Sequence, residues 1–398
     1  MKDFHYYAPT EVAFGINSLQ QLIPFIKKYA LPGKILLHYG RSSAVSSGLL
    51  SSIENQLQEG GLNYISLGGV QPNPRLSLVR EGIALCRKEG VGLILAVGGG
   101  SVIDSSKAIG YGTLYDGDVW DFYIGKSTPT NILPVGCVLT IAAAGSEMSD
   151  ATVISNEDTK QKFGYCNDIG RAKFAIMNPA LTMSLPPFQT ACGAVDIMMH
   201  TMERYFTKDT DMLLRSAMSE ALLRTVKDAA DTLLCRHPSQ AEAFQARSAI
   251  MWASSISHND LLGTRQSSDF ASHKIEHELS ALFDVTHGAG LSAIWPSWAR
   301  YVMKENPQRF ADFATKVMGV QPAENLEQTA LKGIEAMEDC YRRWSMPIGI
   351  KALLGRNLPE ETLCLMADKC TKGDSFHPGY FKSLTKSDIM EIYRIANN

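Results

Sequence analysis

The stretch Leu93-Ile94-Leu95-Ala96-Val97-Gly98-Gly99-Gly100-Ser101 passes from an unbroken apolar run directly into three glycines and a serine. A short apolar run bounded by glycine is typical of a buried strand, and residues 102–109 are expected to begin a helix. This arrangement places free backbone N–H groups at the positive end of a helix dipole, where a pyrophosphate can approach closely. The same sequence is also compatible with a tight turn that binds no ligand. The run matches neither the G-x-G-x-x-G dinucleotide-binding motif nor a Walker A loop.

The segments around this turn favour the ligand-binding interpretation. Short apolar runs lie at residues 34–39 and 64–67, and amphipathic stretches lie at residues 49–59 and 76–88. Alternation of this kind predicts a parallel sheet covered by helices. Residues 151–155 and 162–166 flank a polar turn and predict a hairpin, and residues 173–177 predict one more strand. The first half of the chain is therefore expected to be an α/β domain.

The strand signals stop after Leu185-Pro186-Pro187. Helical spacing of apolar residues then recurs at residues 211–234, 243–256, 269–282 and 326–344. A chain of 398 residues is long enough for two cores. We therefore expect an α/β domain over residues 1–185 and an all-α domain over residues 186–398.

The composition excludes several classes of protein. A net charge of −3 without a basic block argues against nucleic acid as a partner. The first residues lack the features of a signal peptide, and no apolar stretch has the length of a membrane span. The 8 cysteines form no C-x-x-C pair, so neither a disulfide framework nor a thiolate metal site is indicated. These features predict a cytoplasmic, reduced protein without a membrane or nucleic-acid partner.

The second half contains Asp196 and His200 in a D-x-x-x-H pattern, then His273 and His277 in H-x-x-x-H, and then His287. Residues four apart project from one face of a helix, although such pairs often only hydrogen-bond to their neighbours. Asp196 stands in an apolar run, where a carboxylate is costly unless it meets a cation. The combination predicts a divalent metal site. Five candidates exceed the number that a catalytic ion takes, and the spacing leaves open which one is spare.

Four motifs together resemble the iron-containing (group III) alcohol dehydrogenases. They are Gly98-Gly99-Gly100-Ser101, Gly145-Ser146-Glu147, the Asp196/His200 pair, and His273/His277 with His287. The resemblance covers nearly the whole chain and is strongest for the branch of NADPH-dependent aldehyde reductases and butanol dehydrogenases. It implies a Rossmann-like dinucleotide-binding domain followed by an all-helical metal-binding domain, the fold shared with dehydroquinate synthase. It also implies a homodimer.

The resemblance implies a division of the five candidate ligands. In the family, the residues matching Asp196, His200, His273 and His287 bind Fe²⁺, or Zn²⁺ in some members. The residue matching His277 does not bind the metal and lines the site near the nicotinamide and the substrate. His277 is therefore expected to position substrate or to pass a proton.

The resemblance also bears on the cofactor. Family members that prefer NAD carry an acidic residue after the first strand, where it would repel a 2′-phosphate. This chain has Gly40 there, followed by Arg41, Ser42 and Ser43, which offer a guanidinium group and hydroxyl donors. NADP(H) is therefore expected, with NAD less favoured. Further expected cofactor contacts are Asn73, Gly99, Gly100, Ser101, Asp104, Thr140 and Lys162, and Lys160 competes for the role of Lys162.

One stretch departs from the family pattern. Many members have T-T-x-G-T-G-S-E, whereas residues 140–147 are T-I-A-A-A-G-S-E. Ile141 and Ala144 replace threonines, and Ala143 replaces a glycine. Each lost hydroxyl contact would cost about 0.5–1.5 kcal/mol. Either the cofactor preference is altered, or the backbone supplies the donors instead.

These features predict reversible hydride transfer between NADP(H) and a small alcohol or aldehyde, with a divalent metal as Lewis acid. The alternatives are polyol oxidation of the glycerol dehydrogenase kind, a dehydroquinate synthase-like lyase and a metal-dependent hydrolase. The glycine turn and Gly40 argue against the hydrolase, and the order of the ligands favours the dehydrogenase over the lyase. Carboxylate and imidazole ligands suit both Fe²⁺ and Zn²⁺.

Overall fold

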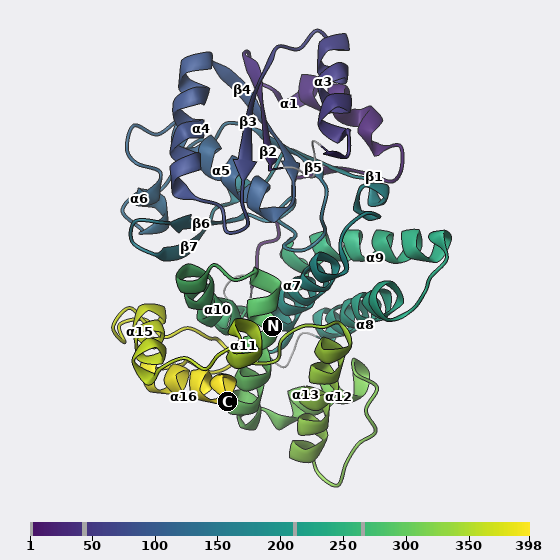
Figure 1. Ribbon diagram of the computed structural model, residues 1–398, viewed down its shortest axis with the longest axis vertical. Helices are drawn as coiled ribbons and strands as arrows, with labels where there is room; N and C mark the ends of the chain where they lie inside the picture. Colours follow the sequence, from purple (N-terminus) through teal and green to yellow (C-terminus); the bar gives the residue numbers. More distant parts are fainter. Residues whose placement is uncertain (1–2, 42–45, 210–212, 264–266) are drawn as a thin grey trace. The chain divides into compact units, whose positions relative to one another are not determined.

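The computed structural model describes residues 3–41, 46–209, 213–263 and 267–398. These residues divide into two compact units (Figure 1). Tyr7–Ser184 forms an α/β unit, and Leu185–Asn398 forms a helical unit that also includes residues 3–6. None of the described helices has both the length and the apolar character needed to cross a bilayer.

The α/β unit is built on a six-stranded sheet whose strand order is β1-β8-β5-β4-β2-β3. The strands are β1 (Glu11–Phe14), β2 (Lys34–Gly40), β3 (Tyr64–Val70), β4 (Val91–Gly98), β5 (Val135–Leu139) and β8 (Phe174–Met177). Every neighbouring pair is parallel, as the alternation of apolar runs and helices predicted. β4 lies between β5 and β2 and is buried along its whole length, which explains its unbroken apolar sequence.

Helices cover both faces of this sheet (Figure 1). On one face, α1 (Leu22–Tyr29) and α3 (Leu49–Glu59) pack on alternate residues of the strands, including Ile35 and Leu37 of β2. The opposite face carries α4 (Leu76–Glu89) and α5 (Gly100–Thr113), which contact each other. His38 points to that face and lies between the Leu67 carbonyl and the Ser105 hydroxyl, each 2.8 Å away. Burial lowers its pKa to about 4, so His38 is a neutral core histidine.

The predicted hairpin is also present. β6 (Ala151–Asn156) and β7 (Gln161–Cys166) pair antiparallel, apart from the main sheet. The short helix α6 (Trp120–Tyr123) holds the hairpin through aromatic contacts. The Trp120 ring stacks on Phe163 of β7 with 5.6 Å between centroids.

The helical unit confirms the change of fold class after the α/β half, since it contains helices and no strand among the described residues. Its helices are α7 (Pro187–Tyr205), α8 (Leu213–Cys235), α9 (Gln240–His258), α10 (Ala271–Phe283), α11 (His287–Val302), α12 (Pro307–Lys316), α13 (Leu326–Arg343), α14 (Ile350–Leu354), α15 (Glu360–Cys370) and α16 (Lys386–Asn397). α11 is buried from Gly288 to Ala299 and packs against α7, α10, α13, α14 and α16. Aromatic contacts hold the second half of α11, where Trp295 and Trp298 pack against Phe206.

Candidate metal centre and nucleotide-binding edge

The predicted nucleotide-binding residues follow the carboxyl ends of neighbouring strands. Tyr39 of β2 pairs with Val97 of β4, and Gly98 of β4 pairs with Leu139 of β5. Gly40, the glycine turn and Thr140 therefore lie at one edge of the sheet. The chain leaves β2 toward β3 and leaves β4 toward β5, so its direction reverses between β2 and β4. Open α/β sheets bind ligands at such a reversal point, outside the carboxyl ends of the strands.

The glycine turn is closely packed against residues after β5. Gly99 is the N-cap of α5, with extended backbone angles of φ −97° and ψ −165°. A Cβ atom on Gly99 would lie 2.1 Å from Cγ2 of Ile141, and one on Gly100 would lie 3.0 Å from Cβ of Ala144. Two of the residues that depart from the family pattern thus occupy the space beside this turn. Its bare N–H groups remain at the start of a 14-residue helix, which is a favourable place for a phosphate.

The other predicted cofactor residues lie in different surroundings. Arg41 is exposed directly after β2, whereas Ser42 and Ser43 lie outside the described residues. Asn73, between β3 and α4, is buried and adopts φ 56°, a strained conformation that asparagine tolerates. Lys162 is buried in β7, whereas Lys160 is exposed in the hairpin turn. Their roles toward a cofactor stay predictions.

Asp104 is directed into the protein. Its carboxylate accepts hydrogen bonds from the Ser146 hydroxyl at 2.5 Å and from the Val153 N–H at 2.9 Å. The Thr152 hydroxyl donates to the Asp104 carbonyl at 2.9 Å. Asp104 therefore connects α5 to β6 and to Ser146 in the segment before β6. A contact with the cofactor, which we expected, stays a prediction.

Lys107 is a residue that sequence reasoning missed. Its ammonium group is fully buried and donates to the carbonyls of Ser146, Ser149 and Ala151 at 2.7, 2.8 and 2.9 Å. Burial lowers its pKa, and the nearby carboxylate of Asp104 opposes this effect. Its position one turn after Asp104 in the helix was the available signal.

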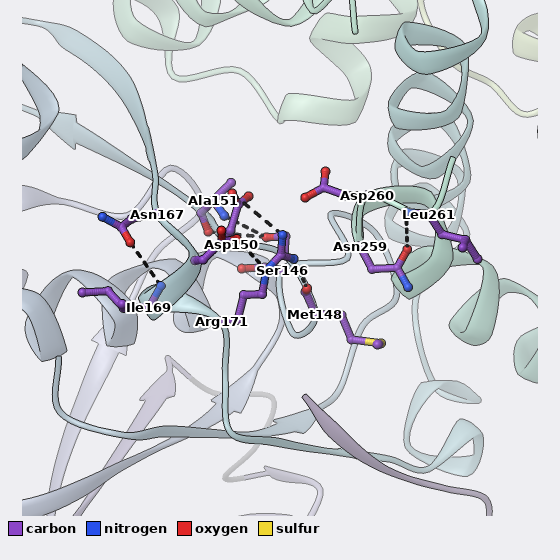
Figure 2. A network of polar contacts seen from close by, with 12 residues as sticks. Ser146, Met148, Asp150, Ala151, Asn167, Ile169, Arg171, Asn259, Asp260 and Leu261 are labelled. Carbon is purple, nitrogen blue, oxygen red and sulfur yellow. Dashed lines mark hydrogen bonds and ion pairs between the residues drawn. The ribbon is translucent and has the colours of Figure 1, made fainter. Parts of the chain in front are cut away.

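Arg171 also contacts this segment. It donates to the Met148 carbonyl at 2.9 Å, and its guanidinium lies 4.0 Å from the Asp150 carboxylate (Figure 2). Buried cations thus hold the segment 146–151 at several carbonyl groups. The end of the loop that follows Thr140 is therefore held in place by buried side chains.

In the helical unit, the structure brings four predicted metal-binding residues together. Asp196 and His200 are buried on one face of α7, His273 is buried in the first turn of α10, and His287 is the first residue of α11. The Asp196 Oδ1 atom lies 3.4 Å from His200 Nδ1, 3.7 Å from His273 Nε2 and 3.8 Å from His287 Nε2. Donor atoms about 2.1 Å from one tetrahedral ion are about 3.4 Å apart, so this spacing suits a shared metal.

The hydrogen bonding supports the same conclusion. Asp196 Oδ1, His200 Nδ1 and His273 Nε2 are buried, and within the described parts of the chain none of the three has a hydrogen-bond partner. Buried polar atoms are rarely left unsatisfied, because their desolvation is not repaid. A divalent ion would satisfy all three at once. The donor set of one carboxylate and three imidazoles is appropriate for such an ion.

The protein environment shifts the pKa values of these histidines in opposite directions. Burial lowers the pKa of His200 well below its usual value, and the neighbouring imidazoles add to this effect. Burial also disfavours the charged form of His273, but the carboxylates of Asp196 and Glu203 outweigh it and raise its pKa to about 9. Without a metal, His273 is therefore charged at neutral pH, with a proton on each ring nitrogen. An ion that binds to Nε2 would have to displace the proton there.

Two glutamates that sequence reasoning missed support the cluster. Glu203 Oε1 lies 3.0 Å from His273 Nδ1, and Glu276 Oε2 lies 2.5 Å from His287 Nδ1. Glu203 follows Asp196 and His200 at the next position of the same helical face, which was the available signal. Glu276 follows His273 by the same three-residue spacing on α10, so it carried the same kind of signal.

His277, the predicted spare histidine, is half-buried beside this cluster. Its ring centroid is 5.8 Å from that of His287, and donor atoms of His277, Glu276 and His287 lie within 4.8 Å of one another. His258, the last residue of α9, lies against His200 with 4.0 Å between ring centroids. The structure thus places two further imidazoles at the edge of the site.

The fold and the two sites define a class, that of oxidoreductases combining a dinucleotide-binding α/β unit with a carboxylate–histidine centre in a helical unit. The family model described as iron-containing alcohol dehydrogenase matches residues 9–179, and that of the Fe-containing alcohol dehydrogenase family, C-terminal, matches residues 190–397. The chain therefore belongs to the iron-containing alcohol dehydrogenase family. It is an alcohol dehydrogenase or aldehyde reductase by this membership, which implies a divalent metal and a nicotinamide cofactor.

Individual relatives match this sequence along all or most of its length. The probable NADH-dependent butanol dehydrogenase 1 of Bacillus subtilis (strain 168) is 38% identical over 398 residues, with 100% of both chains covered. The NADPH-dependent aldehyde reductase YqhD of Escherichia coli (strain K12) is 30% identical, with 90% of this chain and 92% of that protein covered. The crystal structure of NADH-dependent butanol dehydrogenase A from Thermotoga maritima matches with a TM-score of 0.92 and 33% identity, covering 100% of this chain and 99% of that one.

Proposed function

We propose that this protein reduces small aldehydes with NADPH, and oxidises the corresponding alcohols in reverse, at a divalent metal held by Asp196, His200, His273 and His287. The observation that carries the proposal is the group of unpartnered donor atoms facing one point in the helical unit. Small aldehydes or alcohols are the substrates because the compared relatives are named butanol dehydrogenases and aldehyde reductase. Fe²⁺ and Zn²⁺ both fit the donor set, and family membership favours iron.

The residues of this chain divide the work of the reaction. When bound, the metal would supply Lewis acidity to the substrate oxygen, and the nicotinamide would supply or accept the hydride. The backbone N–H groups of Gly99, Gly100 and Ser101, at the start of α5, would bind the pyrophosphate of the cofactor. His277, half-buried beside His287, orients the substrate or passes the proton that reaches the alcohol oxygen.

The preference for NADP(H) follows from the residues after β2. Gly40 ends this strand and carries no carboxylate, so nothing at this position would repel a 2′-phosphate. Arg41 is exposed and adjacent, where its guanidinium can pair with that phosphate. NADH is the second candidate, because two of the compared proteins are named NADH-dependent and one is named NADPH-dependent.

The test combines metal analysis with kinetics. The purified protein is loaded separately with Fe²⁺ and Zn²⁺, and the oxidation of NADPH and NADH is followed with a series of short aldehydes that includes butanal. We expect turnover only with metal present, and a higher kcat/KM with NADPH than with NADH. A metal-loaded protein that turns over no aldehyde or ketone would refute the proposed reaction, while faster turnover with NADH would refute only the cofactor preference.

Two further expectations accompany this function. We propose that the protein is a homodimer, as the family resemblance implies, which light scattering during gel filtration measures directly. We also propose a cytoplasmic location, which fractionation of the source cells tests.

A further inference from the structure

Two buried glutamates each contact the outer edge of one metal-facing histidine. Glu203 is 2% exposed, and its Oε1 atom lies 3.0 Å from Nδ1 and 3.1 Å from the backbone N–H of His273. Glu276 is fully buried, and its Oε2 atom lies 2.5 Å from Nδ1 of His287. A carboxylate only accepts hydrogen bonds, so each Nδ1 must carry the proton. Nε2 of each ring faces Asp196 and is the nitrogen that an ion would bind, once any proton that it carries has been displaced.

These contacts connect the three helices that carry the site in a fixed order. Glu203 lies on α7 and holds a histidine of α10, and Glu276 lies on α10 and holds the first residue of α11. Each helix thus orients the donor atom of the next one along the chain. His200 differs, because it faces Asp196 through Nδ1 and packs its ring against His258.

The surroundings of Glu276 are shaped to keep its carboxylate in place. The Ser280 hydroxyl, one turn later on α10, donates to Glu276 Oε1. On α11, Gly290 leaves the space that this carboxylate occupies, because a Cβ atom there would lie only 2.5 Å from Glu276 Oε1. A glycine in the interior of a helix costs about 0.5–1 kcal/mol relative to alanine. Its presence here is explained by the close approach of the carboxylate.

We propose that Glu203 and Glu276 are positioning residues, which fix the tautomer and the ring orientation of His273 and His287 so that both present Nε2 to the metal. The inference rests on the proposed metal site and extends it to residues that touch no metal themselves. Removing an outer carboxylate of this kind typically weakens metal binding by about 10–100-fold. The donor atoms themselves remain present, so the variants should bind the same ion more weakly.

The experiment measures metal affinity directly, without reference to catalysis. The affinity of the full-length, metal-stripped protein for Zn²⁺ is determined by competition with a chelator, and the Co²⁺ form is followed by its visible absorption. We expect Glu203→Gln and Glu276→Gln to weaken Zn²⁺ binding by about 10–100-fold. The alanine variants should bind more weakly still, because glutamine retains an oxygen acceptor. This gradation is the signature of orientation by a hydrogen bond.

A second route tests Glu276 without altering it. Gly290→Ala should weaken Zn²⁺ binding about as much as Glu276→Gln, because the new methyl group displaces the carboxylate. The matched control is Glu278→Gln, which changes another buried glutamate of α10 that contacts none of the four metal-binding residues by a hydrogen bond or ion pair among the described residues. The control should retain wild-type affinity. Thermal unfolding of the metal-free variants verifies that each one is folded.

The outcomes are distinguishable. Unchanged Zn²⁺ affinity in both glutamine variants and in Gly290→Ala would overturn the inference and leave the proposed metal site intact. An equal loss in Glu278→Gln would also overturn it, since general destabilisation of α10 would then explain the data. Wild-type affinity in His273→Ala would instead overturn the metal site of the proposed function.

Discussion

The proposed nucleotide-binding edge and the proposed metal centre are made of different parts of the chain. This edge consists mainly of backbone, because Gly40, Gly99 and Gly100 have no side chains that would keep a ligand away from it. The proposed metal centre consists of side chains on three helices, and two of the three histidines that face Asp196 also contact a buried carboxylate. A backbone site should be damaged by adding atoms, and a side-chain site by removing them. The following changes separate the two sites on this basis.

The largest effect is expected from His273→Ala. Removing one of four donors leaves an incomplete site and an unpaired Glu203, so metal content should fall to background and activity should be lost with it. Binding of NADPH, followed by its fluorescence, should change little because the α/β unit is untouched. A variant that is metal-replete and fully active would contradict the assignment of this site.

The next change concerns Glu278, a buried carboxylate on the metal-carrying helix. Burial raises its pKa to about 7, partly offset by Lys369 and reinforced by Glu276, against an ordinary value of 4.5. Such a carboxyl stays protonated in the folded protein while the unfolded chain ionises. Glu278 therefore contributes up to about 3 kcal/mol to the free energy of unfolding. This contribution is fully present below pH 4.5 and is lost as the pH rises through about 7.

Glu278→Gln should remove this dependence. We expect the variant to be more stable than the wild type at pH 8 and similar to it near pH 4.5, as measured by denaturant unfolding at both values. A constant difference between the two proteins across this range would show that Glu278 does not titrate as described. Metal affinity should not follow the stability change, which separates Glu278 from Glu276.

Adding one methyl group tests the backbone site. The Cβ atom of Gly99→Ala would lie 2.1 Å from Cγ2 of Ile141, so the turn must shift, at a cost of about 1–3 kcal/mol. We expect NADPH to bind about 10–100-fold more weakly, with metal content unchanged. The double variant Gly99→Ala/Ile141→Ala creates room for the methyl group and should recover part of the affinity. Equal affinity in the single variant and the wild type would show that the turn does not hold the cofactor.

The smallest expected effect is a change in the preference between NADPH and NADH, without loss of activity. Gly40→Asp introduces a carboxylate after β2, where it would repel a 2′-phosphate and accept hydrogen bonds from ribose hydroxyls. The ratio of kcat/KM for NADPH to that for NADH should fall by about tenfold, which corresponds to about 1.4 kcal/mol. Gly61→Asp, at an exposed glycine beyond the C-terminal end of α3 with open space around it, is the control. An unchanged ratio in Gly40→Asp would refute the argument for NADP(H).

Sequence reasoning was most successful where one segment carried its own signal. Apolar runs bounded by glycine predicted β2 and β4, and the polar turn at residues 157–160 predicted the hairpin. β1 and α1 were not predicted, because a four-residue edge strand and an eight-residue helix carry little pattern. β3 continues through Gly68 and Gly69 to Val70, and these two glycines concealed its end.

The site shows the same limit. Asp196 and His200 were recognisable because their spacing fits one helical face, and the family resemblance divided the remaining histidines. Glu203 could not be paired with His273 from sequence, because the two residues are 70 positions apart and lie on different helices, α7 and α10. Lys107 was missed because a single lysine in a helix is usually exposed, whereas here loop carbonyls enclose it. Pairing across distant elements depends on packing, which local spacing does not encode.

The position of β4 has a consequence for the motions of the nucleotide-binding edge. This strand is buried along its whole length and hydrogen-bonded on both sides, so its amides can exchange with solvent only when the sheet itself opens. The glycine turn is the direct continuation of that strand. Residues that are intrinsically the most flexible are thus anchored to what should be the slowest-exchanging segment of the α/β unit. The glycines allow the turn to adopt its conformation, and because β4 anchors the turn, we expect it to move little.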